Sequence, residues 1–447
     1  MKIANTVARR YRGQKLSPSR KREHPRLIGP EWLEQRLLLA GPDRFEPNES
    51  LAAAADIGVG PGAHLAGLTL DSTADQDWYR FELLRKDSID VKASSVSNVD
   101  LKVFDASGQP KGSSQNTVSL TNLDPGTYYV KAFDVGGATN SDYRLVIEPG
   151  SSSSTRVFYV NVKNDPTTAD NFYTTVSGDN ANNGKSDKTP KENVQGVLSD
   201  PNYNLTGTDL VVIDTGTYGG SPVQIFLADQ GAAYAGSPDR STGSNFNLNG
   251  TRFDVVDGDG NLFYGLRFTG SGGTGISARA SSLNNEIRGN TFTDTTTAVR
   301  ISGSSTAYIH HNVISGNTSQ GILVGNSPAV SSPVCTNAST GSSVCIVNNT
   351  IYAPADNAVA VQIQGASSNV GLRNNILWAK GNNGYDISVA DDSQTGFSSD
   401  FNNLFASANG KLVLWQKPFG DLLDWQMEAN FDNHSIGFTS PGGTADT

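Results

Sequence analysis

The sequence predicts an all-β protein in which an antiparallel β-sandwich is followed by a coil of stacked parallel strands. With 47 glycines and only 17% charged residues, the composition favours strands and tight turns over helices. Between residues 79 and 147 apolar residues alternate with polar ones, which is the period of strands with one buried face. From residue 265 onward a short phrase recurs, and its closest pair, Asn290 and Asn312, gives a period of 312 − 290 = 22 residues.

Length and charge limit the classes of partner. At 447 residues the chain is long enough for two or three units or for one unit and a repeat array. The formal charge of −10 is uneven, because residues 1–40 hold 10 basic and 3 acidic residues, which leaves 34 − 10 = 24 basic against 44 − 3 = 41 acidic residues in the rest. Because an acidic body repels phosphate backbones, we do not expect nucleic acid as a partner.

Residues 1–42 read as a basic arm without regular structure. Their longest apolar run, residues 37–40, is too short for a transmembrane span or an ordinary signal peptide. The octet LEQRLLLA (33–40) resembles the LEPR-XLL motif near the start of many secreted or surface proteins of planctomycete-type bacteria, with Gln35 where that motif has proline. The resemblance implies export, so we expect a secreted or cell-surface protein.

Residues 43–149 carry the alternating apolar pattern and form the predicted sandwich. The phrases DRFEPNES, DQDWYRFEL and LDPGTYYVKAF resemble the bacterial pre-peptidase C-terminal (PPC) domain, a jelly-roll-like β-sandwich appended to secreted proteases and other surface enzymes. Asp75 and Asp77 are candidate ligands for Ca²⁺, since this cation takes carboxylate oxygens from turns. The alternative is that both are solvated turn acids beside Trp78.

A Ser-rich linker, residues 150–156, separates the sandwich from the predicted coil at 157–447. Residues 157–205 resemble the entry segment of right-handed parallel β-helix proteins, in which a short helix bearing a glutamine, here Gln195, caps the first turn. An uncovered sheet end exposes apolar side chains and unpaired backbone groups, so a cap is expected there. The matching positions are Gly178, Asp179, Asn182, Gly184, Pro190 and Gln195.

The repeated phrase defines the coil itself. A period of 22 residues fits three short strands and three turns, and wider gaps indicate inserted loops. The pattern resembles the PbH1 repeats of the pectin-lyase-like right-handed parallel β-helix, with a first rung at 206–218 whose Leu210, Val212 and Ile213 point inward. The phrases lie at 265–268, 289–292, 311–314, 348–351 and 374–377, and second strands lie at 298–301, 321–324 and 360–363.

Two features of the repeat could be either structural or catalytic: the recurring asparagines and the pair His310–His311. Asparagine tolerates left-handed backbone, and its amide can bond to a stacked neighbour, so we interpret the phrase as architecture. Adjacent residues of a strand face opposite sides, so His310 and His311 are not expected to share a metal. Cys335 and Cys345 flank a loop rich in Ser, Thr and Gly and favour a local disulfide, with two unpaired thiols as the alternative.

The β-helix resemblance implies that cleavage of acidic polysaccharides must be considered. Lyases need a basic residue and a cation, and hydrolases need paired carboxylates. Asp254, Asp257 and Asp259 are candidate Ca²⁺ ligands, although Asp-Gly-Asp-Gly also makes a tight turn. A row of arginines is a candidate binding site for anionic sugar chains, and within it Arg267 and Arg288 are weak catalytic candidates. Alternatively, the row only keeps an outer face soluble. The row comprises Arg267, Arg288, Arg300 and Arg373.

The end of the sequence, LLDWQMEANFDNHSIGFTSPGG within the segment 400–447, resembles the late segment of these β-helix proteins, where further coils follow. Either such coils are missing here, or this segment caps the last rung. The matching residues are Asp424, Trp425, Gln426, Asp432, Ser435, Ile436 and Pro441.

Taken together, the sequence predicts an exported or cell-surface β-helix protein that binds carbohydrate or another surface polymer through a long flat face. The alternative is a calcium-assisted polysaccharide lyase, or a hydrolase, acting on acidic polysaccharide. Ca²⁺ is the one cofactor expected. Since no G-x-S-x-G, H-E-x-x-H, Walker or Rossmann pattern stands in a supporting context, protease activity is not predicted.

Overall fold

The computed structural model describes residues 41–95, 99–136, 139–239, 242–248, 253–327 and 343–441. Residues 1–40, with the LEQRLLLA motif, lie outside the described residues. Helical segments are short: η1 (Leu51–Ala53), η2 (Thr168–Asp170), α1 (Val194–Leu198), η3 (Leu227–Asp229), η4 (Asp391–Ser393) and α2 (Leu422–Ala429). Within the described part of the chain, no helix combines the length and apolar character that crossing a membrane requires.

Two sheets make the predicted sandwich. One has the order β1 (Ala55–Gly60), β3 (Gln76–Leu83), β8 (Gly126–Phe133), β5 (Asp100–Asp105) and β6 (Pro110–Gln115). The other has the order β2 (His64–Leu70), β9 (Asn140–Pro149), β4 (Asp87–Ser95) and β7 (Thr117–Leu123). The strands pair antiparallel as predicted, except that β1 pairs parallel with β3. Alternate residues of β3, such as Tyr79 and Phe81, are fully buried, as the period-two pattern predicted.

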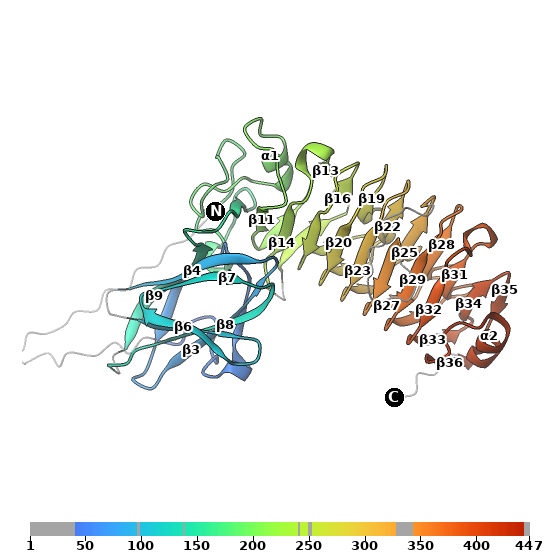
Figure 1. The fold of residues 1–447 in the computed structure, drawn as a ribbon, viewed down its shortest axis with the longest axis horizontal. Coiled ribbons are helices and arrows are strands. Elements are labelled where there is room, and N and C mark those ends of the chain that lie inside the picture. Colours follow the sequence, from blue (N-terminus) through green and yellow to red (C-terminus); the bar gives the residue numbers. More distant parts are fainter. Residues whose placement is uncertain are drawn as a thin grey trace, which may run out of the picture. The chain divides into compact units, whose positions relative to one another are not determined.

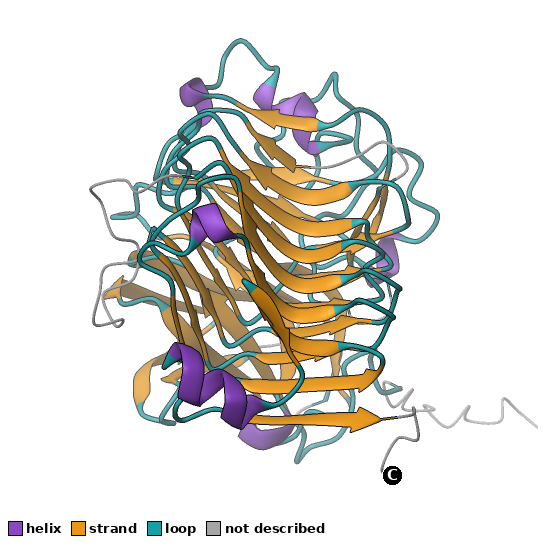
Figure 2. Ribbon diagram, turned by 90° about the vertical axis from the view of Figure 1, so that its right-hand side faces the viewer, coloured by secondary structure: helices purple, strands orange, loops and turns teal. Residues whose placement is uncertain are grey.

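Among the described residues, three sheets of nine strands each, parallel except for the last strand of sheet 3, form a right-handed solenoid, which confirms the predicted β-helix (Figures 1 and 2). Sheet 1 contains β10 (Arg156–Val160), β11 (Asp209–Ile213), β14 (Ala233–Gly236), β17 (Leu262–Tyr264), β20 (Asn285–Arg288), β23 (Ala307–His310), β26 (Val344–Val347), β29 (Val370–Arg373) and β32 (Ser398–Asp400). Sheet 2 contains β12 (Gly216–Tyr218), β15 (Ser244–Asn247), β18 (Arg267–Thr269), β21 (Thr291–Thr293), β24 (Val313–Ser315), β27 (Thr350–Ala353), β30 (Ile376–Ala379), β33 (Asn403–Ala408) and β36 (Ile436–Pro441). Sheet 3 contains β13 (Val223–Ile225), β16 (Phe253–Val255), β19 (Thr274–Ala278), β22 (Thr297–Ser302), β25 (Gln320–Gly325), β28 (Val359–Gln364), β31 (Tyr385–Val389), β34 (Lys411–Trp415) and an antiparallel β35 (Lys417–Phe419).

Inward side chains stack in columns because each strand pairs in register with the next rung. In sheet 2 the column is aromatic at one end, where the rings of Phe268 and Phe292 stack with centroids 4.8 Å apart. It then becomes aliphatic, and every member belongs to one hydrophobic core: Phe246, Phe268, Phe292, Ile314, Ile351, Leu377 and Leu404. The repeated phrases therefore lie directly one above another.

The first rung corrects the sequence prediction. Val211 and Ile213 of β11 belong to the solenoid core, whereas Leu210 and Val212 belong to a second hydrophobic cluster. All four are buried, so the strand is apolar on both faces and its inward side could not be read from alternation. In addition, β10 precedes β11 in sheet 1, so residues 206–218 are not the first strand of the stack.

Both ends of the solenoid core are covered. At the start, α1 includes Gln195 as predicted and buries Val194 and Val197 against the core. At the far end, α2 places the fully buried Trp425 on the last rung. The DWQ phrase therefore caps the last rung, which is one of the two alternatives left open by the sequence.

Candidate functional site

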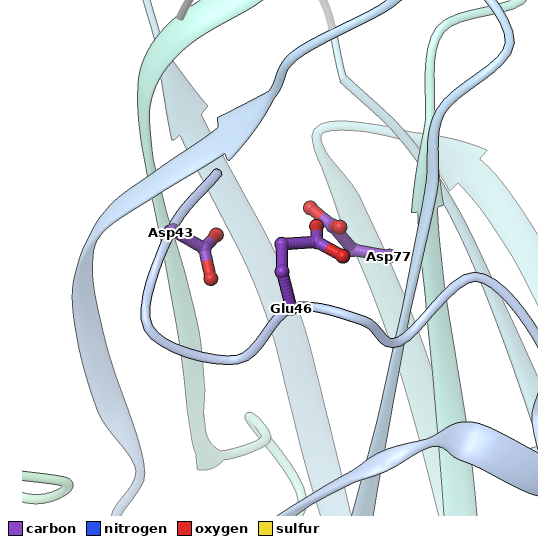
Figure 3. Close-up of side chains that lie close together, drawn as sticks. All are labelled: Asp43, Glu46 and Asp77. Atoms are coloured by element: carbon purple, nitrogen blue, oxygen red, sulfur yellow. The ribbon is translucent and has the colours of Figure 1, made fainter. Parts of the chain in front are cut away.

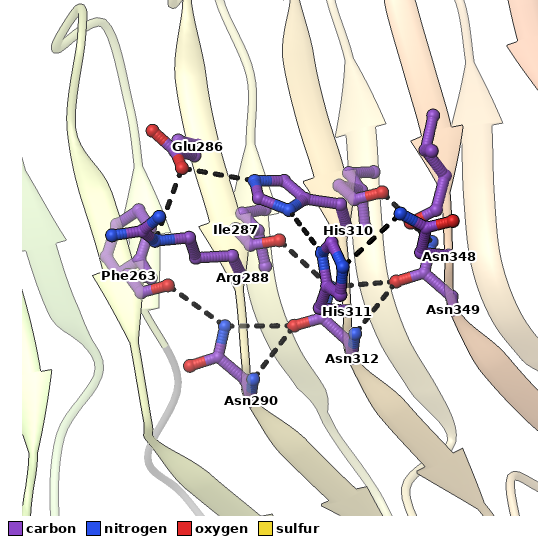
Figure 4. Close-up of polar contacts among 12 residues, drawn as sticks. Phe263, Glu286, Ile287, Arg288, Asn290, His310, His311, Asn312, Asn348 and Asn349 are labelled. Carbon is purple, nitrogen blue, oxygen red and sulfur yellow. Dashed lines mark hydrogen bonds and ion pairs between the residues drawn. The ribbon is translucent and has the colours of Figure 1, made fainter. Parts of the chain in front are cut away.

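A ladder of buried asparagines runs along the turn between sheets 1 and 2 (Figure 4). The side-chain oxygen of each asparagine accepts the backbone N–H and a side-chain N–H of the asparagine one rung earlier; Asn312 N and Nδ2, for instance, lie 3.1 and 3.0 Å from Asn349 Oδ1. The pattern recurs along the whole row, which comprises Asn290, Asn312, Asn349, Asn375 and Asn402. This supports the architectural interpretation, because every polar atom of the row serves the fold.

The residue just before each ladder asparagine makes the turn. Gly289, His311, Asn348, Asn374 and Phe401 have φ values of 65°, 55°, 54°, 55° and 59°. The left-handed backbone predicted for the asparagines thus belongs mainly to their predecessors. A left-handed residue reverses the direction of its side chain relative to a strand, so the expectation that His310 and His311 face opposite sides is wrong.

The two imidazoles instead join one hydrogen-bonded chain (Figure 4). His310 Nδ1 lies 2.8 Å from His311 Nδ1, and His310 Nε2 lies 3.1 Å from Glu286 Oε1. Asn348 Nδ2 lies 3.3 Å from His311 Nε2. In one consistent arrangement Asn348 donates to His311, His311 donates to His310, and His310 donates to Glu286, so every ring nitrogen has one role as donor or acceptor. The chain links three rungs of the turn, which is again a structural role.

The four arginines do not form the predicted row. Arg267 lies on sheet 2 and Arg300 on sheet 3, while Arg288 and Arg373 share a column of sheet 1 with His310 and Val347 between them. The sequence could not reveal this, because a period of 22 residues does not say which of three sheets a residue occupies. Arg288 Nε lies 3.4 Å from Glu286 Oε1, and its Nε and Nη2 are buried without a hydrogen-bond partner among the described residues.

The acids Asp254, Asp257 and Asp259 serve separate backbone and side-chain partners. Asp254 receives a two-point ion pair from Arg279, with both N–O distances 3.0 Å. The Leu227 N–H donates to Asp257, and the Leu283 N–H donates to Asp259. Among the described residues these three do not group as metal ligands. These three acids therefore do not form, among the described residues, the calcium site that the lyase alternative requires.

The predicted disulfide falls partly outside the described residues. Cys345, in β26, is disulfide-bonded. Cys335 lies outside the described residues.

On the sandwich, the predicted calcium ligand Asp77 lies among acids from a different segment (Figure 3). Ligand atoms of Asp43, Glu46 and Asp77 all lie within 4.8 Å of one another. Asp75, predicted as its companion, is not in this group; its carboxylate accepts the Asp71 N–H at 2.7 Å. The signal that sequence reasoning passed over is DRFEPNES, which supplies Asp43 and Glu46 from one short loop.

Burial and mutual repulsion set the charge of this acidic group. Burial raises the pKa of Asp77 to about 9 against a hydrogen bond from Tyr143, and the neighbouring acids add to the rise. Burial also raises the pKa of Glu46. One of the two heteroatoms of the fully buried Asn48 side-chain amide lies 3.1 Å from Asp77 Oδ1. The same atom lies 3.1 and 3.2 Å from the two Glu46 carboxylate oxygens. A nitrogen there donates to the acids, whereas an oxygen there would serve as a further ligand to a shared cation.

The outer surface of sheet 2 carries two columns of apolar side chains toward its C-terminal end. In one column Val313, Ile376 and Ile436 alternate with Thr350 and Asn403, and Ile376 is 50% and Ile436 66% exposed. The other column is aromatic, and its rings follow one another at centroid distances of 4.6, 5.2 and 5.9 Å. We call these residues the apolar face: Val313, Tyr352, Ile376, Trp378, Phe405, Ile436 and Phe438. Strands β27, β33 and β36, which carry part of it, are marked in Figure 1.

A charged and aromatic group borders the apolar face at the turn before β33. The Arg373 guanidinium lies 4.3 Å from the centre of the Phe401 ring, and Phe401 stacks on His434 at 4.8 Å. His434 Nδ1 lies 2.8 Å from Asp400 Oδ2. Burial alone would raise the pKa of Asp400, but the hydrogen bonds from His434 outweigh it and lower that pKa. Of the predicted arginines, Arg373 ends β29 three residues before Ile376, and Arg267 lies two strands before Val313 in the same column of sheet 2.

The aromatic column was missed at the sequence level, although its signal is simple. Tyr352, Trp378 and Phe405 each stand three residues after a ladder asparagine. In the earlier rungs Thr293 and Ser315 occupy the same position. Successive residues of a strand point to opposite faces, so this position lies on the outer face. An aromatic residue there in three successive rungs indicates a surface that contacts a ligand or partner.

Comparisons with known proteins agree with both parts of the fold. The model of the bacterial pre-peptidase C-terminal domain matches residues 75–134, and that of the right-handed beta helix region matches residues 236–337. A search of curated proteins gave no match to this chain.

Among solved structures, the catalytic unit of a thermostable GH87 alpha-1,3-glucanase from Streptomyces thermodiastaticus strain HF3-3 is 13% identical, with 77% of this chain and 68% of that chain covered and a TM-score of 0.34. The catalytic domain of a GH87 alpha-1,3-glucanase in complex with nigerose is 10% identical, with 82% and 90% covered and a TM-score of 0.17. At these TM-scores we draw no argument from either.

Proposed function

We propose that this chain, which contains a bacterial pre-peptidase C-terminal domain and a right-handed β-helix region, binds a polysaccharide on the apolar face of its solenoid. The observation that carries the proposal is the outward-facing aromatic column, in which Tyr352, Trp378 and Phe405 are half-buried and Phe438 is 55% exposed, beside exposed aliphatic residues. Aromatic side chains combine large apolar surfaces with few rotatable bonds, which makes them effective anchors. Sugar rings present C–H groups on their faces, and these groups pack against aromatic rings.

The spacing of the face suits a polymer. Neighbouring strands of a sheet lie about 4.8 Å apart, so a chain lying along the solenoid axis meets a new pair of side chains at each rung. Thr350 and Asn403, which lie between the aliphatic residues, offer hydrogen-bonding groups for sugar hydroxyls. Arg373 at the border adds a donor group to the same side. A long flat face of this kind binds through many weak contacts and needs no deep pocket.

Retention on insoluble polysaccharides tests the proposal. We expect the wild-type chain to be retained by at least one member of a panel of cellulose, chitin, xylan, cross-linked pectate and cross-linked alginate. The double variant Trp378→Ala/Phe438→Ala should bind at least tenfold more weakly, since a tenfold loss corresponds to about 1.4 kcal/mol and two aromatic anchors are removed.

Leu323→Ala is the matched control, because Leu323 is a half-buried aliphatic residue in the middle of β25 on sheet 3. Its binding should equal that of the wild-type chain. Absence of retention on every polymer, or equal losses in the control and the double variant, would contradict the proposal.

We also propose that the protein acts outside the cytoplasm. The disulfide at Cys345 supports this, because disulfides persist in oxidising compartments, and so does the occurrence of PPC domains in secreted enzymes. Fractionation of the producing cells should place the chain in the medium or on the surface; a purely cytoplasmic pool would contradict this.

We further propose that the acidic group Asp43, Glu46 and Asp77 binds Ca²⁺. A site that binds only the folded state stabilises it by about 2.7 kcal/mol at a ligand concentration 100 times the Kd. We therefore expect millimolar Ca²⁺ to raise the Tm of the wild-type chain and to have little effect on Glu46→Gln. Glu49→Gln removes one exposed carboxylate from the same loop and should respond as the wild type does. A shift of the same size in Glu46→Gln would rule out this site.

A further inference from the structure

The outer surface of sheet 2 carries no charged side chain along the described strands from β21 to β36. In these strands the first and third residues point outward, and β36 continues the register of β33. We call these outward positions the uncharged strip. Besides the apolar face, the strip holds only hydroxyl and amide side chains, those of Thr291, Thr293, Ser315, Thr350 and Asn403. Since charged residues make up 17% of the chain and mostly lie on surfaces, their absence here is selective.

Charged side chains do occur on the outer surfaces of the other two sheets in the same rungs. Glu286 and Arg288 point outward from β20 on sheet 1, and Arg300 is exposed on β22 of sheet 3. On sheet 2 itself, Arg267 stands one strand before the strip begins, as the register partner of Thr291. The lack of charge is therefore a property of this one surface and not of the whole solenoid.

The borders of the strip add no row of like charges. At the turn before β33, Arg373 and Asp400 are cross-strand partners, so a positive and a negative group stand opposite each other. At the other border Lys380 directly follows β30 and is exposed to water. Asp386 is fully buried and accepts the Ala379 N–H at 2.6 Å, and burial raises its pKa well above the ordinary value. Burial thus favours the uncharged form of Asp386.

A charged polymer would lose water on this strip without gaining a partner. The effective penalty for desolvating an ion in a protein site is several kcal/mol unless an opposite charge or hydrogen bonds offset it. A polymer with one carboxylate or ammonium on each sugar would meet that penalty again at successive rungs. A neutral sugar needs only hydrogen bonds for its hydroxyls, and the side chains of Thr350 and Asn403 offer these between the aliphatic residues.

We infer that the polysaccharide bound by the apolar face is uncharged. The inference rests on the proposed function and adds the class of polymer to it. Neutral hexose, pentose and N-acetylhexosamine polymers fit the strip, whereas polymers of uronic acids and of free amino sugars are disfavoured. The specificity then comes from what the surface lacks, because a charge on the ligand finds no counterpart there.

Retention on matched polymers tests this inference with the whole chain. Cellulose is paired with its C6-carboxylated form, chitin is paired with chitosan, and pectate and alginate are the further charged polymers. We expect retention by at least one neutral polymer and at least tenfold weaker binding to the charged ones. Binding to the neutral polymer should also persist between about 0.1 M and about 1 M NaCl, although the Debye length shortens from about 10 Å to about 3 Å.

A charge placed on the strip provides a second test. Thr350 is exposed between Val313 and Ile376, so Thr350→Asp sets a carboxylate beneath the polymer. Thr350→Asn has nearly the same shape without the charge and is the matched control. We expect Thr350→Asp to bind the neutral polymer at least tenfold more weakly than Thr350→Asn, which corresponds to about 1.4 kcal/mol. Equal Tm values for the two variants show that the loss lies in binding.

The outcomes separate this inference from the proposed function. Absence of retention on every polymer contradicts the proposed function itself. Retention on charged polymers that equals or exceeds retention on neutral ones overturns only the inference about charge. The inference is also overturned if folded Thr350→Asp binds as Thr350→Asn does, or if salt abolishes retention on the neutral polymer.

Discussion

Replacing Asn349 with alanine is expected to destabilise the solenoid by about 2–5 kcal/mol. The side-chain oxygen of Asn349 accepts two hydrogen bonds from Asn312, and its nitrogen donates to Ile309 O, Val347 O and Asn375 Oδ1. The change leaves the Asn312 N–H and Nδ2 groups without their acceptor in a fully buried row. Each unsatisfied buried polar group costs about 1–3 kcal/mol, and more than one is created here.

Denaturant unfolding followed by circular dichroism measures this effect. Thr350→Ala is the control, because Thr350 is the next residue along the chain and points outward from β27. An exposed change of this kind should stay within about 0.5 kcal/mol of the wild type. If Asn349→Ala were as stable as Thr350→Ala, the ladder would not contribute to stability as described.

Replacing Trp425 with alanine is expected to cost about 3–5 kcal/mol, the usual price of removing a large aromatic side chain from a core. Trp425 is fully buried and lies 5.3 Å from the Phe419 ring and 5.4 Å from the Phe431 ring. Its Nε1 also donates to Asp432 Oδ2 at 3.0 Å. Asp432 in turn accepts from Asn402, the last member of the ladder, so loss of Trp425 loosens the cap and the end of the ladder together.

Hydrogen exchange resolves this effect along the chain. In a solenoid each rung contacts its neighbours only, so faster exchange should be greatest in β33, β34 and β36 and should fade toward β20. Met427→Ala changes a 76% exposed residue of the same helix and should leave exchange unchanged. Uniform acceleration along all rungs would argue against a stack in which Trp425 acts as the end cap.

Much of the fold was readable because it repeats. A short phrase that recurs with a closest spacing of 22 residues, and that has an inward apolar residue two positions after each asparagine, indicates both the stacking and the register. The structure places Phe292, Ile314 and Ile351 in one column accordingly. The N-terminal cap was also readable, since Gln195 lies in α1 as expected, whereas the sequence left open whether the segment of Trp425 forms a cap. Such agreement reflects local patterns that point to the same answer as the overall fold.

The site was less readable, because it depends on which sheet and which face a residue occupies. The arginines fell on three sheets, and a single left-handed residue, His311, turned two histidines toward each other. On β11 both faces are buried, so alternation could not identify the inward residues. The acidic group on the sandwich joins Asp77 to residues more than 30 positions earlier, and only the folded sandwich brings them together.

Oxidative footprinting of the polymer-bound chain tests most directly whether the apolar face is the binding surface. With the polysaccharide that retains the wild-type protein, hydroxyl-radical oxidation read by mass spectrometry should fall at Trp378, Phe405 and Phe438. Oxidation at Leu323 and Leu414, on the outer side of sheet 3, should stay as in the free chain. Protection at those two leucines with the three aromatic residues still oxidised would contradict the proposed function.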